Sequence, residues 1–280
     1  MSEETFEQKF DVKKKTRLDV RNIRGTVDIS PGEDGVIQVT ALKHTDTGDA
    51  KRTEIELTQE SNGTVNAFAR FPDGALSGLF GARPCKVDFT IQVPSQCAVS
   101  VKCVSADTNV RGIHGEVKLN TVSGDINLED LQGDLKVNAV SGDIDLAKVE
   151  GELELRTVSG DIDCSHASGP ASLHTVSGDV CLKESSLPSI NADSVSGDIE
   201  LETPLGEGPY RFHSVSGEVH FKVPEGTQCT AELSSVSGHI STNLPQSTVS
   251  SRPGKQLVKV QGGGVEVFLK SVSGELTLVS

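Results

Sequence analysis

A short repeat constrains this chain more than any other feature of its sequence. The tripeptide Val-Ser-Gly occurs eight times and is followed by Asp or Glu in seven of the copies. Successive copies lie 18, 18, 18, 19, 20, 21 and 36 residues apart, and the last interval is twice 18. A fixed short period of this kind is typical of a stacked repeat architecture. The copies begin at Val122, Val140, Val158, Val176, Val195, Val215, Val236 and Val272.

The repeat unit itself has nine residues. Weaker copies, such as residues 131–134, lie midway between the strong ones. With the valine of Val-Ser-Gly as position 1, apolar residues fall at positions 1, 5 and 7, as in Val122, Ile126 and Leu128. Alternation of apolar and polar residues over positions 5 to 7 is the mark of a half-buried strand. We therefore predict a dry aliphatic interior that contains the side chains of all three positions.

The Ser-Gly-Asp segment that follows each valine predicts a turn. Glycine at position 3 fits a backbone with positive φ, which a Cβ atom would penalise. Replacing Gly142 or Gly160 by valine is expected to cost more than ~1 kcal/mol of stability. The predicted structural turn glycines are Gly124, Gly142, Gly160, Gly178, Gly197, Gly217, Gly238 and Gly274.

One strand per nine residues predicts an all-β solenoid, a β-helix or β-roll, with about 18 residues and two strand–turn units per coil. Coils in such a fold stack about 4.8 Å apart, and each is stabilised by its neighbours. Helical patterns are absent from the sequence. The pattern leaves the handedness of the coil open.

Two regions are expected. Residues 1–97 are less regular and predict an N-terminal β cap with two hairpins, one turning at residues 31–35 and one at 61–63, and a loop at 72–86. Residues 98–280 predict the repeat solenoid, interrupted by an insertion loop at 244–256 that is rich in Pro and Gly. The last coil lies at the C-terminus without a polar cap, so stacking of copies through the coil ends is a possible form of self-association.

Composition narrows the functional classes. The net charge of −14 and the lack of a basic cluster argue against a nucleic-acid partner. The sequence contains no apolar run of the ~20 residues that a membrane-spanning helix needs, and no signal peptide is recognised, so a cytoplasmic protein is expected. Aromatic residues make up 4% of the chain, which offers few stacking platforms for sugars or bases.

The Val-Ser-Gly-Asp ladder follows a β-rich region that contains the sequence NIRGTVDI at residues 22–29. This combination resembles a bacterial family of β-strand-repeat domains of unknown function whose members are commonly labelled "putative adhesins". The resemblance covers roughly residues 15–280. It implies a recognition role and brings no catalytic residues with it.

A column of acidic residues at position 4 is the first candidate site. Stacked in register, neighbouring carboxylates would lie about 5 Å apart and repel one another. Bound cations would offset this repulsion, and so would splaying into water or hydrogen bonds from backbone N–H groups in the turns. Both a structural role and a cation column stay open. The column contains Asp125, Asp143, Asp161, Asp179 and Asp198.

Position 8 places His174, Asp193 and His213 on successive coils, at an outward position. The two histidines would be about 9.6 Å apart, too far for one metal ion, so we expect a solvated face and no metal site. The six cysteines have no CxxC spacing and are expected to be reduced thiols, with Cys164 inside and Cys103 and Cys181 outside.

The predicted loop at 72–86 has an apolar tip formed by Leu76, Leu79 and Phe80. These side chains either fold over the end of the solenoid or contact a partner.

The function expected from the sequence is recognition. Repeats place the same residues at the same outward positions and do not assemble the mixed cluster of an active site, so we expect no enzyme and no cofactor. The partner would be an unidentified protein or polymer. A self-assembling scaffold that stacks through its coil ends is the alternative, and a carbohydrate-active enzyme on a solenoid is a second one.

Overall fold

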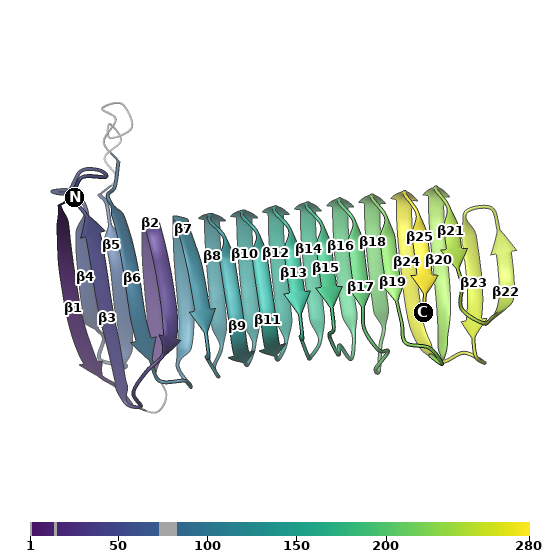
Figure 1. The fold of residues 1–280 in the computed structure, drawn as a ribbon, viewed down its shortest axis with the longest axis horizontal. Coiled ribbons are helices and arrows are strands. Elements are labelled where there is room, and N and C mark those ends of the chain that lie inside the picture. The colour runs from purple at the N-terminus through teal and green to yellow at the C-terminus, as the bar shows by residue number, and fades with distance from the viewer. Residues whose placement is uncertain (1, 14–15, 73–82) are drawn as a thin grey trace. The chain divides into compact units, whose positions relative to one another are not determined.

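The computed structural model describes residues 2–13, 16–72 and 83–280 of the chain. Its regular elements are all strands, which confirms the all-β prediction (Figure 1). No helix in this part of the chain is long and apolar enough to cross a membrane. The strands form two compact units, Met1–Gly142 and Asp143–Ser280, here called unit 1 and unit 2.

The strands of unit 1 are β1 (Glu3–Asp11), β2 (Arg17–Pro31), β3 (Val36–His44), β4 (Glu54–Gln59), β5 (Thr64–Arg70), β6 (Lys86–Val93), β7 (Ala98–Arg111), β8 (Val117–Ser123), β9 (Ile126–Gln132) and β10 (Leu135–Ser141). The strands of unit 2 are β11 (Ile144–Glu150), β12 (Leu153–Ser159), β13 (Ile162–Ser165), β14 (Ala171–Ser177), β15 (Val180–Lys183), β16 (Ile190–Ser196), β17 (Ile199–Glu202), β18 (Tyr210–Ser216), β19 (Val219–Lys222), β20 (Cys229–Ser237), β21 (Ile240–Thr242), β22 (Gln246–Arg252), β23 (Lys255–Val260), β24 (Val265–Ser273) and β25 (Leu276–Val279).

In unit 1 the long strand β2 forms the first coil. It runs parallel to β7 along most of its length, with Arg17 opposite Ala98 and Ile29 opposite Val110. On its other side, its first half pairs with β5 and its second half with β6. The following coils add strands in the same direction, so that β7, β8 and β10 align residues 18 positions apart, as in Val99, Val117 and Leu135.

The N-terminal region contains one of the two predicted hairpins. Strands β4 and β5 pair antiparallel around residues 61–63, which confirms that hairpin. The hairpin predicted to turn at 31–35 is wrong, because β6 lies between β2 and β3. It pairs in parallel with β2 and antiparallel with β3, and β3 pairs antiparallel with β1. The hairpin prediction rests on the local sequence, whereas β6 comes from a segment more than 40 residues away.

Unit 2 contains two parallel ladders. Strands β12, β14, β16 and β18 form one, in which Leu153 aligns with Ala171 and Ala171 with Ile190. Strands β11, β13, β15, β17 and β19 form the other, in which Ile144 aligns with Ile162. The side chains at positions 5 and 7 of these strands face the interior, as predicted. Apolar side chains therefore stack on apolar side chains from coil to coil.

The C-terminal end of the chain does not lie at the end of unit 2. Strand β24 is inserted between β18 and β20 and pairs in parallel with both, as Figure 1 shows. Strand β25 lies in the same way between β19 and β21. The prediction of an uncapped C-terminal coil is therefore wrong, because a coil can insert between two earlier coils that carry the same repeat.

The insertion loop predicted at 244–256 is also wrong. Most of this segment forms β22 and the start of β23, which pair antiparallel with each other, while β23 pairs antiparallel with β20. Pro245 precedes β22 and Pro253 follows it, and Gly254 has a φ of 71° in the turn between the two strands. Pro245 thus lies just before a hairpin, and Pro253 and Gly254 form the turn between its two strands.

Aromatic side chains enter the interior of unit 2 where the spacing of the repeats becomes longer. The rings of Tyr210, Phe212 and Phe221 are fully buried, and the rings of Tyr210 and Phe212 lie 5.9 and 5.0 Å from that of Phe221. The Tyr210 hydroxyl donates to the carbonyl oxygen of Leu187 at 2.5 Å and accepts from the amide of Gly206 at 2.6 Å. Its polar group is therefore satisfied within the core.

Candidate recognition surfaces

The valine of each Val-Ser-Gly copy faces outward, and the prediction that it lies in the interior is wrong. Among the described residues, the large apolar side chains that are exposed are the nine valines at this position. Exposed valines on successive coils form a row in each unit, and we call these the valine rows. They are Val104, Val122 and Val140 in unit 1, and Val158, Val176, Val195, Val215, Val272 and Val236 in unit 2.

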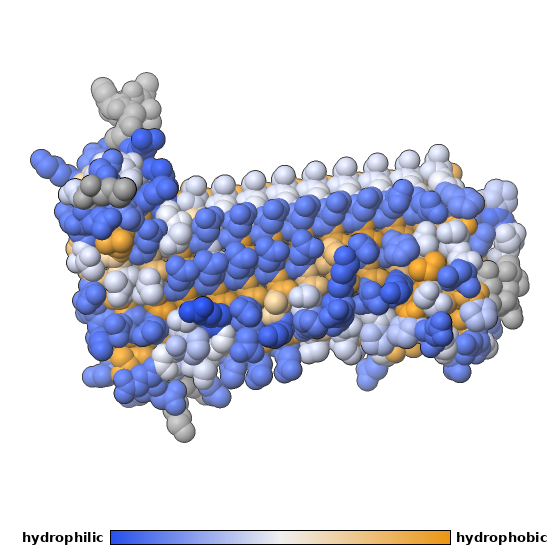
Figure 2. Space-filling model, in the orientation of Figure 1, coloured by the Kyte–Doolittle hydropathy of each residue, from blue (hydrophilic) through white to orange (hydrophobic). Residues whose placement is uncertain are grey.

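The residue before each valine explains why the valine faces outward. Thr157 and Thr175 precede Val158 and Val176 and are 4% exposed, so the inward alternation of positions 5 and 7 continues to position 9. With strict alternation along the strand, the next side chain must face outward. The alternating bands of hydrophilic and hydrophobic side chains that result can be followed across the strands in Figure 2.

The weaker copies turn the chain differently. The residue at position 9 before each of them has a positive φ of 50–57°, and the next side chain is buried. A left-handed residue interrupts the alternation, which brings position 1 back into the interior. These left-handed residues are Asp130, Lys148, His166 and Glu184, and the buried residues after the first three are Leu131, Val149 and Ala167.

Six buried hydroxyls lie beneath the valine row of unit 2, and that of Ser235 donates to the carbonyl oxygen of Gly274 at 3.4 Å. Within the described part of the chain, the oxygen atoms of the other five have no hydrogen-bond partner. An unpaired buried hydroxyl destabilises the folded state. The residues are Thr157, Thr175, Ser194, Ser214 and Ser271.

The turn assignment of the glycines agrees with the backbone. Gly178 has a φ of 144°, and a Cβ atom on it would lie 2.1 Å from the carbonyl oxygen of Gly160 in the neighbouring coil. Of the eight predicted glycines, Gly238 has no positive φ, although a Cβ there would lie 2.0 Å from the carbonyl oxygen of Gly274. Glycine is therefore required at these turns for two reasons: the positive φ angle and the close packing of neighbouring turns.

The aspartate column is joined by hydrogen bonds between coils. In unit 2, Asp143 Oδ1 accepts a hydrogen bond from the amide of Asp161 at 2.9 Å, and Asp161 Oδ1 accepts one from Asp179 at 2.8 Å. In the same way, Asp179 Oδ1 accepts from the amide of Asp198, and Asp198 Oδ1 accepts from the amide of Glu218. Each carboxylate thus accepts a charge-assisted hydrogen bond from the next turn.

Unit 1 contains the same bond. Asp107 Oδ1 accepts from the amide of Asp125 at 3.1 Å, and Asp88 Oδ1 accepts from the amide of Thr26 at 2.9 Å. These bonds give the column a structural role. No group of three or more His, Cys, Asp or Glu side chains in the described residues is arranged to hold a metal ion, and the cation column stays an untested prediction.

The position-8 residues form a polar pair on the surface of unit 2. His174 Nδ1 lies 3.0 Å from Asp193 Oδ2, and Asn191 donates to the same carboxylate oxygen at 2.8 Å. The strand register places His213 opposite Asp193 on the next coil. His174 and Asp193 therefore pair with each other on an outward face.

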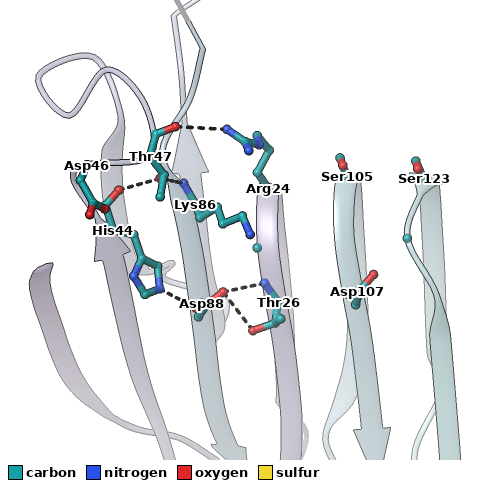
Figure 3. Close-up of a pocket in the computed structure, with 12 residues that line it drawn as sticks. Arg24, Thr26, His44, Asp46, Thr47, Lys86, Asp88, Ser105, Asp107 and Ser123 are labelled. Atoms are coloured by element: carbon teal, nitrogen blue, oxygen red, sulfur yellow. Dashed lines mark hydrogen bonds and ion pairs between the residues drawn. The ribbon is translucent and has the colours of Figure 1, made fainter. Parts of the chain in front are cut away.

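A cavity of about 690 Å³ in unit 1 was not foreseen from the sequence. Figure 3 shows the side chains that line it, which come from β2, β3, β6, β7 and β8 and from the segment after β3 that contains Asp46 and Thr47. Asp88 lies at its floor, where Oδ2 is 2.6 Å from His44 Nε2 and Oδ1 also accepts from the Thr26 hydroxyl at 3.1 Å. The other ring nitrogen of His44 lies 3.5 Å from Glu3 Oε1. Both nitrogens of this histidine therefore face carboxylates.

Two cationic groups line the same cavity. Arg24 donates to the carbonyl oxygens of Pro84 at 3.0 Å and Thr47 at 3.4 Å, which fixes the guanidinium at the rim. The Lys86 side chain is exposed and has no partner among the described residues. Asp46 and Asp107 add two further carboxylates to the lining. This mixture of charges suits a small ligand that carries both an anionic group and hydrogen-bond donors. No local sequence pattern predicts this cavity, because its residues come from segments far apart in the chain.

All six cysteines are free thiols. Burial raises the pKa of Cys164 and of Cys97 to about 12, and that of Cys229 to about 11. Cys164 lies inside, as predicted, but Cys103 is buried and not outward, because it occupies position 9 before Val104. These buried thiols are structural side chains that resist ionisation.

The predicted partner contact at Leu76, Leu79 and Phe80 lies outside the described residues.

Comparison with known proteins places the chain in a family. A family model described as Toastrack DUF4097 matches residues 14–169 and again residues 163–279. The chain belongs to the Toastrack DUF4097 family. This confirms the expected membership of a family of domains of unknown function. No curated protein matches the sequence.

Several solved structures are similar over nearly their whole length. A "putative adhesin" from Bacteroides fragilis is 13% identical, with 98% of this chain and 97% of that one covered and a TM-score of 0.48. A "putative adhesin" from Parabacteroides merdae is 10% identical, with coverage of 99% and 96% and a TM-score of 0.47. A "putative cell adhesion protein" from Clostridium sporogenes is 12% identical, with 99% of both chains covered and a TM-score of 0.27.

Proposed function

We propose that this protein is a non-enzymatic recognition module that binds a protein or polymer partner along its valine rows. The observation that carries the proposal is the regular exposure of valine at one corner of the repeat. Soluble proteins rarely expose contiguous apolar side chains, and where they do, the patch is usually an interaction site. Val158, Val176 and Val195 lie on three successive coils and are 46–48% exposed.

The surroundings of the valine row in unit 2 define the chemistry of the partner. An acidic residue follows three positions after most of these valines, as Asp161 follows Val158, so an acidic row accompanies the apolar row from coil to coil. A partner that presents apolar groups beside basic groups would complement both rows. Charge attraction of this kind is weakened by salt, whereas apolar burial is not, so the affinity should fall only in part at high ionic strength.

The absence of catalytic activity is part of the proposal. Both ring nitrogens of His44 in the unit 1 cavity face carboxylates, which supports a structural role over that of a general base. The two serines of the same cavity, Ser105 and Ser123, lie at exposed positions of β7 and β8.

Binding to a panel of immobilised polysaccharides and extended peptides tests the proposal. The full chain is compared with a variant carrying Val158→Ser, Val176→Ser and Val195→Ser. At least one polymer should bind the unaltered protein, and the variant should bind it at least ~10-fold more weakly. A matched control carries Glu200→Ser and His220→Ser, two exposed positions on β17 and β19, and should bind as the unaltered protein does. Equal binding by all three proteins, or no binding at all, would contradict the proposal.

A further inference from the structure

The C-terminal coil of unit 2 occupies a slot between two coils that precede it in the sequence. On one flank β24 pairs with β18, with Tyr210 opposite Val267. On the other flank it pairs with β20, with Cys229 opposite Val265. Strand β25 is held in the same way between β19 and β21 (Figure 1). The last segment of the chain is therefore an interior element of the sheet.

This segment contributes to the core as fully as any other coil. The side chains of Val267, Leu269, Leu276 and Leu278 are completely buried. Backbone hydrogen bonds join it to both neighbours, such as Val219 N to Glu275 O and Leu276 N to His239 O, both at 2.9 Å. A slot without it would expose apolar surface and two rows of unpaired backbone groups, both of which favour refilling by a strand of the same sequence.

The tether of this segment is short and rich in glycine. Residues 261–264 read Gln-Gly-Gly-Gly and cross from one side of β20 to the other, because Val260 and Val265 both lie opposite Cys229. Two strand spacings, about 9.6 Å, separate those two positions. The tether also passes close around the start of β20, where a Cβ atom on Gly264 would lie 2.7 Å from the carbonyl oxygen of Gln228.

From this topology we infer that the segment 265–280 is an exchangeable element, and that the same segment of a second copy of this chain can fill the slot. All contacts of the slot form equally well with the segment of either copy, so the tether alone decides which copy supplies it. A flexible glycine tether keeps the chain's own segment at high effective concentration, which favours the closed monomer. Shortening the tether should reverse that preference.

Deleting Gly262 and Gly263 tests the inference. Two residues then connect Val260 to Val265, and their three Cα steps span at most about 10–11 Å. That length is enough for a straight path of about 9.6 Å. It is too short for the tether, which must pass around the start of β20. The shortened chain should form a dimer of twice the mass of the chain in light scattering, with a melting temperature close to that of the unaltered protein. A control with two additional glycines after Gly263 should stay monomeric. A folded, monomeric deletion variant would overturn the inference.

A second experiment decides the question if the shortened chain does not fold. A full chain carrying Leu276→Asp and Leu278→Asp cannot bury its own segment, because two charges would enter the core. A fluorescent peptide of residues 261–280 should bind this variant saturably, one peptide per chain, and raise its melting temperature. The same peptide with both aspartates should not bind. Lack of binding by the unaltered peptide would overturn the inference.

Discussion

The repeat of unit 2 has two kinds of corner, the Val-Ser-Gly copies and the weaker copies midway between them. The side chain at position 1 is exposed at the first kind and buried at the second. Val149 is completely buried, whereas Val158, the same residue type nine positions later, is 48% exposed. The difference lies in the preceding residue. Lys148 has a φ of 57° and an outward side chain, while Thr157 continues the strand with its side chain inside. The conformation of one residue therefore decides whether the next valine builds the core or the surface.

This division lets one nine-residue pattern serve two purposes. The left-handed corner contributes an additional apolar residue to the interior of each coil. The Val-Ser-Gly corner leaves the interior to a small hydroxyl side chain and presents its valine to a partner. Four sets of variants test this comparison.

The largest effect is expected at the glycines, which both corners share. A Cβ atom on Gly169 or Gly178 would lie 2.1 Å from a carbonyl oxygen of the neighbouring coil, whereas a Cβ on Gly226, also at positive φ, meets nothing within 4 Å. Gly169→Ala and Gly178→Ala should each cost more than ~3 kcal/mol in urea unfolding, and Gly226→Ala about 1 kcal/mol. Equal costs for all three would show that the turns are not tightly packed.

The next largest effect should distinguish the buried valine of one corner from the exposed valine of the other. Val149→Ala removes two buried methyl groups and leaves a cavity, so it should lower the free energy of unfolding by about 2–3 kcal/mol. Val158→Ala changes a half-exposed side chain and should cost less than ~0.5 kcal/mol. Urea unfolding of both variants measures the difference. Similar costs for the two would mean that the corners are equivalent.

A smaller effect concerns the left-handed residue itself. Lys148→Thr places a β-branched side chain at positive φ and should cost about 1–2 kcal/mol. Lys148→Asn should cost close to nothing, because asparagine tolerates this conformation. Thermal unfolding distinguishes them. A tolerated threonine would contradict the assignment of a left-handed residue at this corner.

The smallest effect concerns the buried hydroxyls. Thr175→Val keeps the shape of the side chain and removes an unpaired polar group, so it should raise the free energy of unfolding by about 1 kcal/mol. Ser172→Ala, on the outward face of the same strand, is the control and should change little. A loss of stability in Thr175→Val would show that the hydroxyl has a partner in solution.

Local features of this fold were predictable from sequence. The turns at Gly124 and Gly178 and the inward side chains at positions 5 and 7 follow from patterns of a few residues. The orientation of the valines was predicted wrongly, although a signal exists. The small polar residue before each valine, such as Thr157, continues the inward alternation and requires Val158 to face outward.

Non-local features could not be predicted in this way. Strands β24 and β25 carry the same repeat as every other coil, so their register fits any neighbour and does not reveal the slot they occupy. The cavity in unit 1 brings together Arg24, His44 and Lys86 from three strands, and no motif in the sequence links these three residues. Only the pairing of β6 between β2 and β3 places them side by side.

Thiol accessibility tests the central claim most directly. Cysteine is introduced at one corner in Val176→Cys and at the other in Val149→Cys, and a soluble maleimide is added to the folded proteins. Relative to the unaltered chain, Val176→Cys should show one additional thiol that reacts at the rate of a free cysteine. Val149→Cys should show none until the protein is unfolded. A protected thiol at 176 together with a reactive one at 149 would contradict the outward valine row and the recognition surface built on it.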